Sequence, residues 1–116
     1  MQKVTLTQTE RQVARREGMN EVTETYRVRA ELAQGLQKLA EGEMVNGDTG
    51  YGICEVKKVG RYWYATWALE TYEEDGLDPD GYEFEEMMAG HILWDLSTVL
   101  GRHELDIEIN WRGLSN

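Results

Sequence analysis

The chain has 116 residues, of which 41% are hydrophobic and 29% are charged; such usage is typical of a globular domain and argues against wholesale disorder. Twenty-two acids against twelve Lys and Arg residues give a formal net charge of −10. This charge disfavours a protein that binds nucleic acid on its outer surface, because such a protein needs a basic surface to displace counterions. We therefore expect one acidic domain over residues 1–116, with no direct contact with nucleic acid.

Cys54 is the only cysteine, so no disulfide can form within the chain, which favours a reducing compartment. The first residues carry no apolar run of the kind found in secretory signals. No stretch of the sequence approaches the roughly 18 consecutive apolar residues that a membrane-spanning helix requires. The sequence therefore predicts a cytoplasmic protein without a membrane segment.

Charge is distributed unevenly along the chain. Residues 1–40 carry seven bases and five acids, whereas residues 41–116 carry five bases and seventeen acids. Residues 70–86 hold nine acids and no base. Such an uneven distribution indicates either an interaction surface or a solvated acidic segment, and it is the most informative feature of the sequence.

The first forty residues are predicted to form two helices. Thr7 and Glu10 have the spacing of a capping box, so a first helix is expected to begin there. Asn20 can cap a second, longer helix whose apolar residues recur at near-helical spacing. Residues 21–29 also alternate between apolar and polar, so a strand followed by a shorter helix at 30–41 is the alternative.

Residues 10–31 loosely resemble a helix-turn-helix unit with arginines on its second helix. Glu17 and Glu24 fall where such a unit buries apolar side chains, and the acidic domain would repel DNA. The arginines of the first helix are instead expected to be solvated or to contact the chain's own acids. These arginines are Arg11, Arg15 and Arg16.

Residues 51–72 are predicted to form a β-hairpin. Two runs rich in β-branched and aromatic residues flank Gly60, which supplies the turn. On the second strand, Trp63 and Trp67 share the face that is expected to be buried. The opposite face carries three tyrosines that either form a protein contact or are covered by the N-terminal helices. They are Tyr62, Tyr64 and Tyr72.

A helix is predicted at 82–100, since apolar residues recur at helical spacing and Gly101 follows where a helix commonly ends. Residues 104–111 alternate without interruption and are predicted to form a last strand with one buried face. The expected fold is therefore an α+β domain in the order α-α-β-β-α-β. Its small antiparallel sheet consists of the 51–72 hairpin and the 104–111 strand, with helices packed on one face.

No sequence motif identifies a catalytic, metal or cofactor site. Around Gly81 the acidic segment has part of the spacing of an EF-hand loop, but the first ligand and the bidentate acid are missing. The glycine-rich stretch at 47–52 precedes a strand rather than a helix, which does not fit a phosphate-binding loop. We therefore expect no catalytic residue, no metal and no cofactor.

His91 and Asp95 lie one helical turn apart, so they share a face that could orient an imidazole or seat a metal. A metal site needs further ligands that no second motif supplies, and a hydrogen-bonded pair is the simpler expectation. Cys54 has no nucleophile signature around it and is expected to be a small buried side chain. An enzymatic or small-ligand domain with a pocket near His91 and Asp95 stays as an alternative function.

The preferred hypothesis is a non-catalytic acidic inhibitor or binding protein. The acids of the last strand lie about 7 Å apart on its outward face, close to the phosphate spacing along one DNA strand. Together with the acids of residues 70–86, they could imitate a nucleic acid and occupy the basic groove of a nuclease or another nucleic-acid-binding protein. The expected partner-binding residues are Glu70, Glu73, Glu74, Asp75, Asp78, Asp80, Glu83, Glu85, Glu86, Glu104, Asp106 and Glu108, with Tyr62, Tyr64 and Tyr72.

Phage anti-restriction and anti-CRISPR proteins and toxin-immunity proteins include small acidic cytoplasmic proteins of this size and charge. No motif in this sequence matches a particular family among them. A structural phage or bacterial protein, for example a homodimer paired through strand edges, is the remaining alternative. None of these hypotheses requires a membrane partner.

Overall fold

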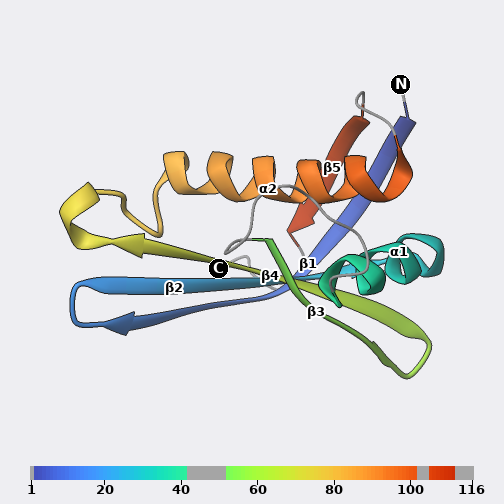
Figure 1. The fold of residues 1–116 in the computed structure, drawn as a ribbon, viewed down its shortest axis with the longest axis horizontal. Coiled ribbons are helices and arrows are strands. Elements are labelled where there is room, and N and C mark those ends of the chain that lie inside the picture. Colours follow the sequence, from blue (N-terminus) through green and yellow to red (C-terminus); the bar gives the residue numbers. More distant parts are fainter. Residues whose placement is uncertain (1, 42–51, 102–104, 112–116) are drawn as a thin grey trace.

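Five strands form one mixed sheet in the order β3-β4-β2-β1-β5, and two helices pack on one of its faces (Figure 1). The computed structural model describes residues 2–41, 52–101 and 105–111. The elements, in chain order, are β1 (Gln2–Arg16), β2 (Met19–Val28), α1 (Ala30–Ala40), β3 (Gly52–Val59), β4 (Tyr62–Tyr72), the short 3-10 helix η1 (Glu73–Asp75), α2 (Tyr82–Leu100) and β5 (Leu105–Trp111).

The sheet is mixed because its last strand joins it in parallel. The pairs β1–β2, β2–β4 and β3–β4 are antiparallel, whereas β5 runs parallel to the first half of β1. With 19 residues, α2 is about 28 Å long, which is enough to carry the chain from β4 across the sheet to the far side of β1. The prediction of a small, wholly antiparallel sheet is therefore wrong.

Residues 2–28 form a long β-hairpin instead of the predicted helices. β2 alternates between half-buried and buried side chains along its whole length, which is the periodicity of a strand. Both strands are rich in valine and threonine, whose branched side chains favour strands. Gly18 has a φ of +76° in the turn between them. The order is therefore β-β-α-β-β-α-β, and the helix-turn-helix resemblance does not hold.

The other predicted elements are confirmed. α1 is the shorter helix of the alternative weighed above, since it follows a strand and begins at Ala30. β3 and β4 form the expected hairpin, and α2 and β5 match the predicted helix and last strand within a residue. Strong, uninterrupted periodicity thus gave the correct element type in the second half of the chain.

The helix-facing side of the sheet and the inner sides of both helices form the hydrophobic core. Trp67 and Tyr26 are fully buried there, with their rings in an edge-to-face contact at 5.7 Å between centroids. Trp63 is half-buried against the same core, as predicted for this face of β4. The helices contribute the buried residues Leu32, Ala33, Leu36, Leu39, Phe84, Met88, Ile92 and Leu96.

Val99 of α2 packs directly on Gly35 of α1. A Cβ atom at this position would lie 2.3 Å from Cγ1 of Val99, so a side chain here would force Val99 to move. We expect Gly35→Ala to lower the free energy of unfolding by about 1–2 kcal/mol, because the overlap outweighs the better helix propensity of alanine.

The matched test repeats the substitution in a Val99→Ala background and compares urea unfolding of all four proteins. With the overlap removed, Gly35→Ala is expected to become stabilising, because only the helix propensity remains. The same effect of Gly35→Ala in both backgrounds would contradict the packing argument.

Candidate binding site

A buried ion pair joins β1 and β2, which are neighbours in the interior of the sheet. Glu24 of β2 is only 2% exposed, and its carboxylate accepts a hydrogen bond from the Tyr26 hydroxyl at 2.5 Å. Nε of Arg11 donates to the other carboxylate oxygen at 3.2 Å. A carboxylate removed from water in this way needs a cation and hydrogen bonds, and both are supplied here.

A β-bulge in β1 brings Arg11 to this position. Before the bulge, the even-numbered residues Val4, Leu6 and Gln8 are buried on the helix side. The register shifts between Gln8 and Glu10, so that Arg11 pairs directly with Glu24 on the helix side. One additional residue therefore changes which side chains of β1 face the core.

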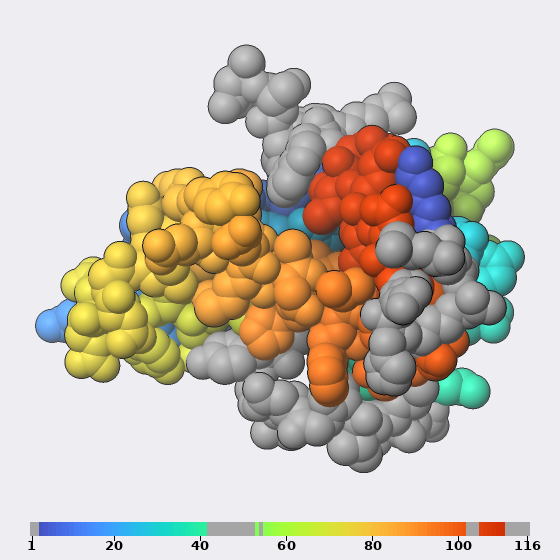
Figure 2. All heavy atoms as spheres, turned by 90° about the horizontal axis from the view of Figure 1, so that it is seen from above, coloured from blue at the N-terminus to red at the C-terminus, as the bar shows by residue number. Residues whose placement is uncertain are grey.

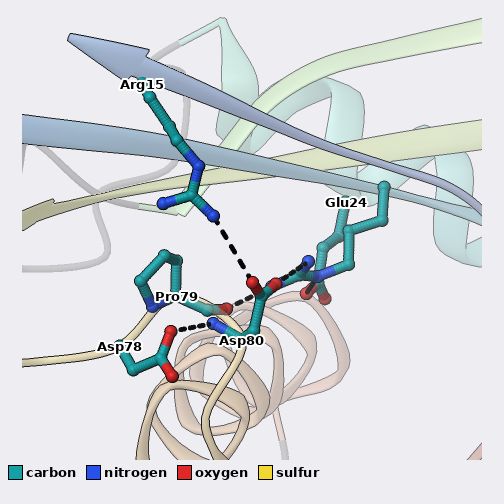
Figure 3. A network of polar contacts seen from close by, with 6 residues as sticks. Arg15, Glu24, Asp78, Pro79 and Asp80 are labelled. Atoms are coloured by element: carbon teal, nitrogen blue, oxygen red, sulfur yellow. Dashed lines mark hydrogen bonds and ion pairs between the residues drawn. The ribbon is translucent and has the colours of Figure 1, made fainter.

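The same guanidinium also binds the loop that precedes α2, whose residues Asp78, Pro79 and Asp80 are labelled in Figure 3. Nη1 of Arg11 donates to Asp80 at 3.0 Å, and Nη2 donates to the backbone carbonyl of Pro79. Arg15 reaches the second carboxylate oxygen of Asp80 at 3.4 Å. The Asp78 side chain accepts a hydrogen bond from the backbone N–H of Asp80 at 2.9 Å, which closes the turn. The expectation that these arginines contact the chain's own acids is confirmed for Arg11 and Arg15.

Burial and the adjacent Glu24 carboxylate both raise the pKa of Tyr26 far above its ordinary value of 10.0. The hydroxyl therefore stays protonated and keeps donating to Glu24. Because the folded-state pKa is raised, the contribution of Tyr26 to stability is complete below the unfolded-state pKa and falls as the pH rises above it.

A cavity of about 180 Å³ lies between this part of the sheet and the first turns of α2. Its wall is mostly apolar. The lining residues are Glu24, Tyr26, Tyr82, Glu85, Glu86, Ala89 and Ile109. The cavity is open to solvent on one side, since Tyr82, Glu85, Glu86 and Ala89 in its lining are exposed.

Most of the acids of residues 70–86 gather at one end of the molecule, where η1 and the start of α2 lie (Figures 1 and 2). We call this region the acidic end and define it by its exposed acids: Glu73, Glu74, Asp75, Asp78, Glu83, Glu85 and Glu86. Among the described residues, Asp80 is the only one of the nine acids in 70–86 that forms an ion pair. Glu70 accepts a hydrogen bond from Tyr72 instead, at 3.1 Å.

The acids of the last strand are not part of the acidic end. Asp106 and Glu108 alternate with the core-packed Ile107 and Ile109, so they lie on the face of the sheet away from both helices. Glu108 forms an ion pair with Lys3 of the neighbouring strand at 2.9 Å. Glu104 lies outside the described residues. The structure therefore does not bring these predicted site residues together with those of residues 70–86.

The three predicted tyrosines lie on the same helix-free face. Tyr62 and Tyr72 are exposed and Tyr64 is half-buried. The N-terminal helices that were expected as an alternative cover do not form, and both α1 and α2 pack on the other face. The guanidinium of Arg27 lies 4.6 Å from the ring centroid of Tyr62, a distance typical of a cation–π contact.

Asp95 has a structural role. It is buried and accepts hydrogen bonds from Nε1 of Trp67 at 2.8 Å and from the backbone N–H of Ile53 at 3.2 Å. Ile53 lies beside a bulge in β3, so the carboxylate satisfies a backbone donor at an interrupted ladder. His91 and Asp95 do not line the cavity described above. The side chain of Cys54 lies outside the described residues.

Sequence reasoning missed the Arg11–Glu24–Tyr26 cluster. The available signal was the alternation of residues 22–28, in which Glu24 occupies a position that the pattern assigns to a buried side chain. A buried acid needs a cationic partner, but the sequence does not show which arginine supplies it, because that depends on the bulge.

Comparison with family models, with curated proteins and with solved structures finds no match for this chain. Within residues 2–41, 52–101 and 105–111, no group of three or more His, Cys, Asp or Glu side chains is arranged to hold a metal ion. No helix in this part of the chain is both long and apolar enough to span a membrane.

We expect Arg11→Met to lower the free energy of unfolding by about 3–5 kcal/mol, because it leaves the Glu24 carboxylate buried without a cation. The matched control is Arg15→Met. Because the Arg15 side chain is 61% exposed, this substitution should lower the free energy of unfolding by less than about 1 kcal/mol. Urea unfolding of both variants at neutral pH measures the difference. Equal losses of unfolding free energy in the two variants would show that the buried Glu24 carboxylate is not stabilised by Arg11.

Proposed function

We propose that the protein is a non-catalytic inhibitor that binds a basic surface of a nucleic-acid-handling protein, such as a nuclease, through its acidic end. The observation that carries the proposal is the near absence of internal neutralisation: among the described residues, only Asp80 of the nine acids in 70–86 forms an ion pair. The other carboxylates keep their charge for a partner. Binding to a positive surface would relieve their mutual repulsion.

Exposed aromatic and sulfur-containing side chains lie close to these acids in the chain. Tyr72 precedes η1, and Tyr82 and Met87 lie in the first turns of α2; all three are exposed. Tyrosine and methionine are enriched at the centres of protein interfaces, where they bury a large area at a modest entropic cost. This combination supports a protein partner, because simple solvation of an acidic loop needs no exposed apolar groups.

The acidic end is also held in a defined geometry. Arg11 and Arg15 bind the loop that leads into α2, and the backbone N–H of Glu73 donates to the carbonyl of Gly18 at 3.1 Å. Preorganised charges lose less entropy on binding than charges on a free loop. The formal net charge of −10 would also steer a basic partner toward the molecule at long range.

In this proposal, nucleic-acid mimicry is confined to the acidic end. Asp106 and Glu108 face away from the helices, and Lys3 neutralises part of their charge. Their spacing along β5 therefore carries no weight in the proposal, and the pair provides a matched control.

We expect the double charge reversal Glu73→Lys/Glu74→Lys to slow association with the partner by about tenfold or more, because it weakens electrostatic steering. The partner is the protein that the unmodified chain recovers from host extract at low salt, identified by mass spectrometry. Association rates are measured with the purified pair. Raising the salt to about 0.5 M, where the Debye length is about 4 Å, should slow the unmodified chain in the same direction.

The control is Asp106→Lys/Glu108→Lys, which makes the same change in net charge on the other face. A larger fall in association rate in the Glu73→Lys/Glu74→Lys variant than in this control supports the acidic end as the binding surface. Equal falls in association rate in the two variants would indicate that association depends only on the net charge of the protein. An association rate that changes neither with salt nor with the substitutions would rule out the proposed function.

A further inference from the structure

The cavity between the sheet and α2 has the features of a small-ligand site. Its floor comes from Glu24 and Tyr26 of β2 and Ile109 of β5, and its roof comes from the first two turns of α2. Three elements distant in sequence therefore build one hollow, and the Arg11 contacts fix the start of its roof.

The inside of the cavity favours an uncharged, mostly apolar group. Glu24 is the only ionisable carboxylate in the floor, and its oxygens are already bound by Arg11 and by the Tyr26 hydroxyl. The remaining floor and wall include the Ile109 side chain, Ala89 and the ring of Tyr26. At about 180 Å³, the space accommodates one aromatic ring with a short substituent.

The rim of the cavity favours a cation. Glu85 and Glu86 are exposed, and neither forms an ion pair among the described residues. Tyr82 is 73% exposed beside them, and the adjacent Glu86 raises the pKa of its hydroxyl above the ordinary value of 10.0. Two carboxylates next to an exposed aromatic ring form a suitable environment for an ammonium group.

We propose that this cavity binds a small organic cation: an aromatic amine whose ring enters the cavity while its ammonium group pairs with Glu85 and Glu86. This site does not rest on the proposed inhibitor function, because it is carried by the cavity and its lining.

Tyramine is the probe, since it has a phenol at one end and an ammonium group at the other. Binding is followed by the NMR shifts of the Ala89 and Ile109 methyl groups during titration. The matched anion is 3-(4-hydroxyphenyl)propionate, which keeps the ring and the chain but reverses the charge. We expect saturable shifts with tyramine and none with the anion.

Two changes at the site separate its rim from its interior. Glu85→Gln/Glu86→Gln should weaken tyramine binding about tenfold or more, whereas Glu83→Gln, an exposed acid on the same helix outside the lining, should leave it unchanged. Ala89→Phe should abolish binding by filling the cavity, and circular dichroism checks that each variant is folded.

The site is disproved by any of three results. These are binding weaker than about 10 mM, equal binding of the anion, or undiminished binding in the folded Glu85→Gln/Glu86→Gln variant. Because no protein partner enters this experiment, its failure would leave the proposed inhibitor function intact, and the reverse also holds.

Discussion

The structure depends on how a carboxylate is accommodated on the buried face of the sheet. Glu24 lies among core residues of β2 and would be costly there without a cation. The bulge in β1 supplies that cation by placing Arg11 directly opposite. The guanidinium has further N–H donors, which bind Asp80 and the carbonyl of Pro79. These contacts connect the sheet to the start of α2.

The position of α2 then determines the surface features. Its first turns form the roof of the cavity, and its exposed acids extend the acidic end beyond η1. The acidic end is therefore attached to the buried cluster through Asp80 and Pro79, which Arg11 binds. The helix-free face is chemically different: it carries the tyrosines of β4 and a mixture of charges that includes the Lys3–Glu108 pair.

The helix and strands of the second half could be predicted because their periodicity is unambiguous, as in the alternation of residues 105–111. Their pairing could not, since β5 joins the sheet in parallel with β1. The first half could not, because Thr7 and Glu10 mimic a capping box while the valines and threonines around them favour a strand. Whether such a segment forms a helix or a strand depends on its pairing with strands that are distant in sequence. The cluster could not be predicted for the same reason: Arg11 and Asp80 are 69 residues apart, and the bulge that places Arg11 opposite Glu24 has no sequence signature.

Native-state hydrogen exchange in the Arg11→Met variant tests the account most directly. If Arg11 holds α2 on the sheet, protection should fall much more at the backbone amides of residues 85–89 than at those of β3 and β4, and Arg15→Met should leave both regions nearly unchanged. A uniform loss of protection across α2, β3 and β4 in the Arg11→Met variant would contradict the account, because it would mean that the buried pair stabilises the sheet without positioning the helix.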